Sequence, residues 1–448
     1  MPVRVDVFGV PQIAGLVAAR LRRVDASSVF RRRNDVEHGQ ADAYEEDAGA
    51  FCQYHWRNAQ FLICGSICSN ITVVLVRLKP DTTSVGEAFR PSLPKGLIMS
   101  AQLKLSRRDL LLSLPALSVA RQVFGQSPTK LKIRALNHMT IAVTDPKRTI
   151  DFYQTLFGMP IQAHQGPGTT VLRIGPGPQF LAVGSVASGQ SPSITHYCVT
   201  VEDFSVDRVL KVLAEHGITK SETNAPMKVR VRMRGPENGG AKEGTPEVYV
   251  TDPDGIVVQL QDPKYGGGAG VLGDVLKVEP SPKHGLLALE DLSHFTISEK
   301  DSTQSNKFYQ DLFGMGFRSY QGPTAPTLAI GSGVQFVMFT GGGGAGRAGA
   351  PPAPPRPASI NHASFSMKNF NVETVQKALE SVGIKPRQGT GPAGPMQHYV
   401  SMRMENRGGA KEGTPELYFT DPDGLLMQIQ DVTYCGGGGV LGSVCPPL

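Results

Sequence analysis

The chain has 448 residues, of which 40% are hydrophobic, and a formal net charge of +6 from 45 Lys and Arg against 39 Asp and Glu. This length leaves room for two or three domains of ordinary globular composition. The charge is mild and no basic face with interleaved aromatic residues accompanies it, so the sequence gives no indication of nucleic-acid binding. No apolar run reaches the roughly 18 to 20 residues of a membrane helix, and we expect no membrane insertion.

The first 98 residues differ in composition from the rest of the chain. They are rich in Arg and hold three of the six cysteines, Cys52, Cys64 and Cys68. One interpretation is a small extra domain in which these cysteines bind a metal or form disulfides. We favour the alternative that residues 1–98 form no recognisable domain, because they are unstructured or because translation starts at Met99.

Residues 99–125 are similar to a twin-arginine signal peptide. Arg107 and Arg108 follow a polar, basic opening and precede an apolar run that ends in small residues suited to cleavage near Ala120. An ordinary amphipathic helix with an Arg pair is the alternative. If the signal operates, the mature chain starts near Arg121, and we expect a periplasmic or secreted protein.

From residue 131 onward, strand and helix patterns alternate. Apolar residues at helical spacing, such as Ile150, Phe152 and Leu156, predict a helix over 146–157, and a similar pattern predicts one over 205–217. Short runs rich in β-branched and aromatic residues predict strands. These strands are 136–143, 160–163, 169–174, 179–183, 194–201, 228–233, 247–251 and 256–261. Each half of the segment therefore has the order β-α-β-β-β.

A tight turn joins the last two of these strands. Pro253 presets φ, Asp254 can bond to its own backbone, and Gly255 tolerates a positive φ. The sequence therefore predicts a β-hairpin, which needs the rest of the domain to be stable.

The same pattern occurs twice in the chain. The sequence GGAKEGTPEVYVTDPDGIVVQLQ at 239–261 returns as GGAKEGTPELYFTDPDGLLMQIQ at 408–430, and FYQTLFGM at 152–159 returns as FYQDLFGM at 308–315. The two copies differ in length chiefly in the Gly-, Ala- and Pro-rich run 341–357, for which we expect a flexible loop.

The repeat defines the domain organisation. We expect an α+β protein of four βαβββ modules, paired into domains 131–265 and 287–435, with a Gly-rich linker at 266–286 and a Gly-rich tail at 436–448. We also expect the two domains to pair within the chain. Cys435 and Cys445 lie ten residues apart around a Gly-rich segment, and a disulfide could join them in an oxidising compartment.

Paired βαβββ modules, a His in the first strand of each module and an Asp-Pro-Asp-Gly turn before the last strand resemble the vicinal oxygen chelate (VOC) superfamily. This superfamily includes glyoxalase I, extradiol dioxygenases, fosfomycin-resistance enzymes and bleomycin-binding proteins. The resemblance covers 131–265 and 287–434. It implies tandem VOC domains, each a cupped mixed β-sheet around a small-molecule site.

Strand alternation places the histidines on one face of each sheet. In strand 136–143, His138 shares a face with Thr140, while Met139, Ile141 and Val143 share the other. The same alternation recurs in the strands that contain His196, His294 and His362. We expect the apolar faces to pack on helices and the His faces to form the floor of the cup.

The resemblance also implies the metal ligands. In metal-dependent members, two His and a carboxylate bind a divalent ion and leave positions open for substrate oxygens. The matching residues would hold Fe, Mn, Ni or Zn: His138, His196 and Gln259 in the first domain, and His294, His362 and Gln428 in the second. Both third ligands depart from the family pattern, which usually has Glu there, and a neutral Gln should hold a dication more weakly.

Six further residues are candidates for a role in the site. Glu247 and Glu416 could supply a substitute carboxylate or a general base, although an exposed hairpin Glu is the commoner outcome. By resemblance to ring-cleaving members, Tyr249 and Tyr418 could contact the substrate; packing at the sheet rim is the alternative. Arg234 and Arg403 could bind an anionic substrate or could be solvated.

Cys198 shares the His face of its strand. It could contact the substrate, but a small buried filler is the commoner role for such a residue.

We therefore expect an exported, metal-dependent VOC protein that acts on a small substrate with adjacent oxygens, by ring cleavage, isomerisation or lyase chemistry. The alternative is a metal-free cup that sequesters a small molecule, as bleomycin-binding members do. A third possibility is one working and one structural domain, against which both copies carry the same His, His, Gln set.

Overall fold

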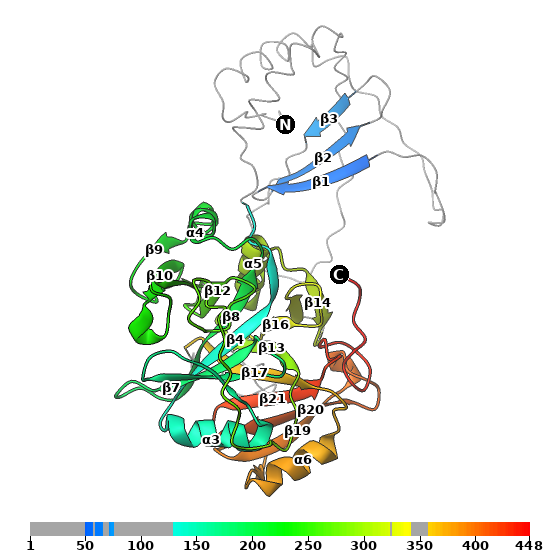
Figure 1. The fold of residues 1–448 in the computed structure, drawn as a ribbon. Helices are drawn as coiled ribbons and strands as arrows, with labels where there is room; N and C mark the ends of the chain where they lie inside the picture. The colour runs from blue at the N-terminus through cyan, green and yellow to red at the C-terminus, as the bar shows by residue number, and fades with distance from the viewer. Residues whose placement is uncertain (1–49, 57–58, 66–70, 76–128, 323–324, 342–356) are drawn as a thin grey trace, which may run out of the picture. The chain divides into compact units, whose positions relative to one another are not determined.

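A computed structural model of the chain describes residues 50–56, 59–65, 71–75, 129–322, 325–341 and 357–448. The chain divides into two compact units, Met1–Ser118 and Val119–Leu448 (Figure 1). The predicted signal at 99–125 and most of the run at 341–357 lie outside the described residues, so both remain predictions.

The first unit contains a three-stranded antiparallel sheet in the order β1-β2-β3. Its strands are β1 (Ala50–Trp56), β2 (Ala59–Gly65) and β3 (Ile71–Leu75). The sequence of this segment predicts no recognisable domain, and the apolar runs that form β2 and β3 carry no clear strand boundaries.

The second unit holds two mixed nine-stranded sheets with the same topology, which confirms the predicted α+β fold of tandem βαβββ modules (Figure 1). In sheet order, the first sheet contains β5 (Ile161–His164), β6 (Thr169–Arg173), β7 (Phe180–Ser185), β4 (Ile133–Val143), β8 (Ser193–Val201), β12 (Val257–Gln261), β11 (Thr245–Thr251), β10 (Lys228–Arg234) and β9 (Thr219–Lys220). The second contains β14 (Phe317–Tyr320), β15 (Pro326–Ala329), β16 (Phe336–Phe339), β13 (Asp291–Ser298), β17 (Ser359–Met367), β21 (Leu426–Asp431), β20 (Thr414–Thr420), β19 (Gln397–Arg403) and β18 (Lys385–Pro386). The two-residue strands β9 and β18 are too short to leave a sequence pattern.

Each module has one helix, and local capping sets its ends. Helix α3 (Pro146–Phe157) has the predicted bounds: the Asp145 side chain accepts a hydrogen bond from the Arg148 N–H, Pro146 occupies the first turn, and Gly158 ends the helix at φ 64°. Asp301 and Gly314 cap α5 (Ser302–Phe313) in the same way. The other helices are α4 (Val206–Glu215) and α6 (Val372–Ser381), and short 3-10 turns lie at Pro236–Asn238 and Glu405–Arg407.

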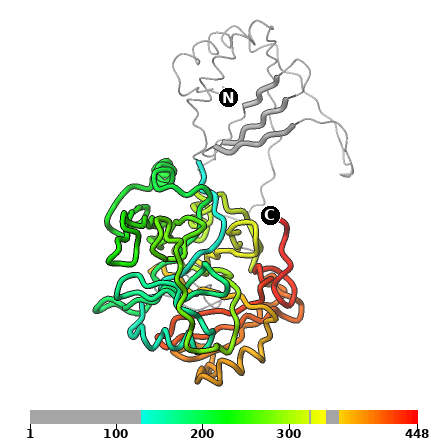
Figure 2. The backbone as a smooth tube through the Cα atoms, in the orientation of Figure 1, coloured from blue at the N-terminus to red at the C-terminus, as the bar shows by residue number. Residues whose placement is uncertain are grey.

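The two copies share one hydrophobic core. The apolar face of β4 is fully buried, as alternation predicted, and Tyr197 of β8 stacks on Phe295 of β13 at 4.9 Å between ring centroids. Figure 2 shows the backbone of both copies, the first from cyan to green and the second from yellow to red. Since the apolar faces take up the shared core, the polar His faces are free to form the two sites.

Each Asp-Pro-Asp-Gly turn contacts the other copy. Asp423 of the second copy accepts a hydrogen bond from the Thr144 hydroxyl and pairs with Arg148 at 3.1 Å, both at the start of α3. The reciprocal turn residue Asp254 pairs with Lys300 at 3.7 Å. The turns therefore close their own hairpins and also join the two domains.

Cys435 and Cys445 form a disulfide, with a Cα–Cα distance of 6.4 Å. None of the helices in the described part of the chain is long and apolar enough to cross a membrane.

Candidate functional site

The central strands of the first sheet bring the three predicted metal ligands together. In the β4–β8–β12 register, His138 and Gln259 both lie opposite Cys198, and His196 is two residues along β8. The Gln259 Oε1 atom lies 3.1 Å from His138 Nε2 and 3.0 Å from His196 Nε2. Residues far apart in sequence thus meet at one point on the polar face.

The hydrogen bonds of His138 fix its tautomer. Its Nδ1 atom lies 2.7 Å from Asn137 Oδ1, an oxygen that can only accept, so Nδ1 carries the hydrogen. A neutral imidazole has one N–H, and Nε2 therefore presents a lone pair. This lone pair faces Gln259 Oε1, which is also an acceptor.

His196 has the same tautomer. The Thr195 hydroxyl donates to the Thr140 carbonyl at 3.2 Å, so it accepts from His196 Nδ1 at 3.0 Å. His196 Nε2 then presents its lone pair toward Gln259 Oε1, with the Thr140 hydroxyl 3.1 Å away. Three acceptor atoms therefore converge in the first site.

The second site has the same three residue types but one Gln–His contact instead of two, and the Ser293 hydroxyl lies 3.1 Å from His294 Nδ1 where Asn137 contacts His138. Gln428 Oε1 lies 3.1 Å from His294 Nε2, and Asn361 Oδ1 accepts from His362 Nδ1 at 2.9 Å. His362 Nε2 is buried and has no hydrogen-bond partner among the described residues. An Asn directly precedes and orients one histidine in each copy, His138 in the first and His362 in the second, and this Asn-His pair is visible in the sequence.

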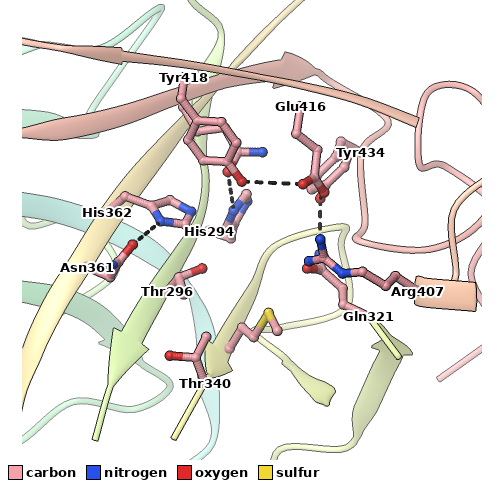
Figure 3. A pocket seen from close by; sticks show the side chains of 12 residues that line it. His294, Thr296, Gln321, Thr340, Asn361, His362, Arg407, Glu416, Tyr418 and Tyr434 are labelled. Atoms are coloured by element: carbon pink, nitrogen blue, oxygen red, sulfur yellow. Dashed lines mark hydrogen bonds between the residues drawn. The ribbon is translucent and has the colours of Figure 1, made fainter. Parts of the chain in front are cut away.

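A cavity of about 170 Å³ opens onto the second site. Figure 3 shows His294, His362 and Tyr418 on one side of it and Thr340 and Arg407 among the other lining residues. This volume is close to that of an engineered cavity of about 150 Å³ that binds benzene. The space therefore suits a ligand of about one ring.

All four imidazoles are neutral at neutral pH. Burial lowers the pKa of His196 and of His362 to about 4. Burial, and then the neighbouring imidazole, hold the pKa of His138 and of His294 well below the usual range. Stacking on Phe180 at 4.2 Å and on Phe336 at 4.3 Å holds the rings of these last two in place.

Glu247 and Glu416 are buried. This differs from the exposed hairpin position that is the commoner outcome for such a Glu. Glu247 accepts hydrogen bonds from Arg234 Nε at 2.7 Å, Tyr249 at 3.0 Å and Tyr265 at 2.7 Å. Its charge is thus compensated by the buried guanidinium. Within the described ranges no group of three or more His, Cys, Asp and Glu side chains could hold a metal, so neither Glu joins the histidines as a substitute ligand.

Arg234 and Arg403 are fully buried, which argues against the predicted direct contact with an anionic substrate. Besides Glu247, Arg234 donates to the carbonyls of Gly239 at 2.6 Å and Gly268 at 3.0 Å. The same bonds recur for Arg403 with Glu416 and Gly437. Each arginine therefore orients a buried carboxylate, Glu247 or Glu416, and donates a hydrogen bond to a carbonyl of a Gly-rich loop.

Tyr249 and Tyr418 lie at the site, edge-on to His196 and His362 at ring-centroid distances of 5.4 and 5.3 Å. Cys198 is fully buried and its thiol contacts its own strand, so it lies beneath the site as a filler. Burial raises the pKa of this thiol well above its usual value, which keeps it protonated. Tyr265 and Tyr434, which complete the two Glu networks, were missed although they repeat at the same offset as the hairpins.

The converging acceptors fit a divalent transition-metal ion. Adjacent ligands about 2.1 Å from an octahedral ion lie about 3 Å apart, which is the separation of Gln259 Oε1 from both Nε2 atoms. The set contains no anionic ligand, so it would leave the charge of the ion uncompensated.

A profile of the Glyoxalase/Bleomycin resistance protein/Dioxygenase superfamily matches residues 135–260 and 291–429. No curated protein matches the chain. Among solved structures, homoprotocatechuate 2,3-dioxygenase from Brevibacterium fuscum, in complex with 3,4-dihydroxyphenylacetate, is 18% identical with a TM-score of 0.47, over 68% of this chain and 83% of that one. The enzyme of that name from Arthrobacter globiformis gives the same identity and TM-score, over 68% and 81%.

Proposed function

The chain belongs to the glyoxalase/bleomycin resistance protein/dioxygenase superfamily, and we propose that each of its two domains binds a divalent metal ion and a small substrate that chelates the ion through adjacent oxygens. The observation that carries the proposal is the meeting of two imidazole Nε2 atoms and one amide Oε1 at 3.0 to 3.1 Å, while the Nδ1 atoms of both rings contact other acceptors. Lone pairs that face one another repel unless a cation lies between them.

His138, His196 and Gln259 would hold the ion in the first domain, and His294, His362 and Gln428 in the second. Imidazole ligands suit Fe, Mn, Ni or Zn. The bound ion would act as a Lewis acid on the substrate oxygens.

The residues around the second cavity orient the substrate. Tyr418 donates its hydrogen to Glu416 at 3.4 Å, so its oxygen is available to accept from a substrate hydroxyl. Burial raises the pKa of this phenol well above its usual value, which keeps it neutral while it does so. We infer ring cleavage, isomerisation or lyase chemistry, and an exported protein, from the family resemblance and from residues 99–125; the disulfide is typical of an oxidising compartment.

A metal-free binding cup is the second candidate, and the orientation of one amide favours it. The Gln259 Nε2 atom is buried and has no partner among the described residues. If the amide were turned by 180°, its two N–H groups could donate to both imidazole lone pairs and satisfy the site without an ion.

Metal analysis of the full chain tests the proposal. The protein is purified without chelators or an added His-tag, beside a His138→Ala/His294→Ala variant. Near-stoichiometric Fe, Mn, Ni or Zn that the variant lacks would support the metal site and justify substrate screens with catechols and hemithioacetals. No metal in the wild-type chain, even after incubation with each ion, would leave the binding cup as the function.

A further inference from the structure

We propose that the two sites have diverged in the ligand they take: the first binds a ligand with a carboxylate beside its chelating oxygens, and the second binds an uncharged ring. This inference rests on the proposed function for the chelating oxygens, but the anion subsite itself needs no metal.

The difference lies on strand β10 and on its counterpart β19, which pair with β11 and β20 respectively. Strand β10 places Arg230 opposite Tyr249 and Arg232 opposite Glu247. At the same register of the second sheet, β19 places Tyr399 opposite Tyr418 and Ser401 opposite Glu416. The first site therefore has two guanidinium groups where the second has a phenol and a hydroxyl.

Both arginines face the first site. The Arg230 guanidinium carbon lies 5.2 Å from the centre of the Tyr249 ring, and Arg232 lies 3.6 Å from Glu247. Arg230 is partly buried, whereas the Arg232 side chain is 47% exposed, so solvent screens the charge of Arg232 and Arg230 is the principal cation here.

The charges of the first site do not balance. Glu247 is the one carboxylate in contact with both Arg234 and Arg232. Arg230 has no ion pair among the described residues, and its Nε atom is buried without a hydrogen-bond partner. A buried donor without a partner is unfavourable, and a ligand carboxylate could accept a hydrogen bond from it.

The second site has a different wall. There Arg403 and Glu416 form a balanced pair, and Tyr399 stacks on Tyr418 at 5.0 Å between ring centroids. Arg387 covers the outer face of Tyr399 at 3.8 Å and donates to Gly391, so the ring separates its charge from the site. The rings that do line the second cavity are His294, His362, Tyr418 and Tyr434, and such a lining suits an uncharged ring.

Arg407 is the basic residue that lines the second cavity, beside the carboxylate of Glu416, and its counterpart in the first copy is Asn238. Its side chain is exposed, so solvent and salt screen its charge. We therefore expect it to attract anions weakly and without selecting among them.

Calorimetric titration of the metal-loaded full chain tests the divergence with three probes: catechol, 3,4-dihydroxybenzoate and benzoate. His294→Ala isolates the first site and His138→Ala isolates the second. The first site should bind 3,4-dihydroxybenzoate about tenfold or more tighter than catechol, the size of one charge-assisted hydrogen bond. The second should bind the two diols within about threefold.

Two reciprocal exchanges provide matched controls. Arg230→Tyr/Arg232→Ser, which installs the residues of the second copy, should remove the carboxylate preference and keep catechol binding. Tyr399→Arg/Ser401→Arg should create the preference in the second site. Equal preference at both sites, or a preference that survives the first exchange, would overturn the inference and leave the proposed function standing.

Benzoate distinguishes the anion subsite from the proposed chelating function, because it has a carboxylate but lacks the diol. If catechol binds neither site but benzoate binds the first site in a manner that depends on Arg230, the anion subsite stands and the chelating function fails. If none of the probes binds the first site, both fail.

Discussion

Replacing Arg403 with Met is expected to destabilise the protein by about 4 kcal/mol or more. Arg403 is fully buried, pairs with Glu416 at 2.8 Å and donates to the Gly437 carbonyl at 3.0 Å. Met fills similar space but leaves a buried carboxylate without its cation, at a cost of about 3–5 kcal/mol. We take the lower end of this energy range, because Tyr418 and Tyr434 still donate hydrogen bonds to Glu416. The unpaired carbonyl adds about 1 kcal/mol.

Urea unfolding of the full chain, followed by circular dichroism, measures this loss. The second variant is Arg403→Met/Glu416→Gln, in which no charge is left unpaired, so it should be more stable than Arg403→Met alone. Arg134→Met, an exposed position, serves as a surface control and should stay within about 0.5 kcal/mol of the wild type. A loss below about 1 kcal/mol for Arg403→Met, or a double variant no more stable than the single one, would refute the ion-pair argument.

Three other predictions test the metal set, the buried carboxyl at the domain contact and the disulfide. Gln428→Glu adds an anionic ligand and should raise metal affinity in titrations by about tenfold or more; an unchanged affinity would contradict the assigned ligand. Burial raises the pKa of Asp252, which accepts a hydrogen bond from Tyr309 of the other copy, from 3.8 to about 6, so the contribution of this carboxyl to stability is lost as pH rises through this window. Asp421 and the site histidines also titrate here, so the difference between the two proteins is measured: Asp252→Asn, which keeps the acceptor for the turn, should gain stability relative to the wild type as pH rises from 4 to 7, and parallel curves would speak against it. Cys435→Ser should lower stability by about 2–3 kcal/mol and make the chain insensitive to reducing agent, whereas continued sensitivity would point to another disulfide.

Local patterns predicted most of the fold because each element carries its own signal. Helix α3 was predicted to the residue, since Asp145, Pro146 and Gly158 mark its ends. The alternation in β4 gave its buried and polar faces correctly. Strands β9 and β18 could not be predicted, because two residues held by backbone pairing alone show no periodicity.

The site was predicted in part, and the errors have one physical cause. His138, His196 and Gln259 meet as the family resemblance implied. The surroundings of Glu247 depend on side chains from three separate segments, and no local pattern shows that Arg234 and Tyr265 reach it. Sequence alternation gave the face of this Glu but not its burial or its partner.

The energetics of the two copies argue that both sites are used. Buried polar atoms without partners are costly, and each copy has two imidazoles, three of the four being buried, and a Gln with an unpartnered amide nitrogen. A domain with only a structural role would be more stable with apolar residues at these positions. This polar set supports the proposed ligand in each copy, and the exchange of Arg230 and Arg232 for Tyr399 and Ser401 supports the proposal that the two ligands differ.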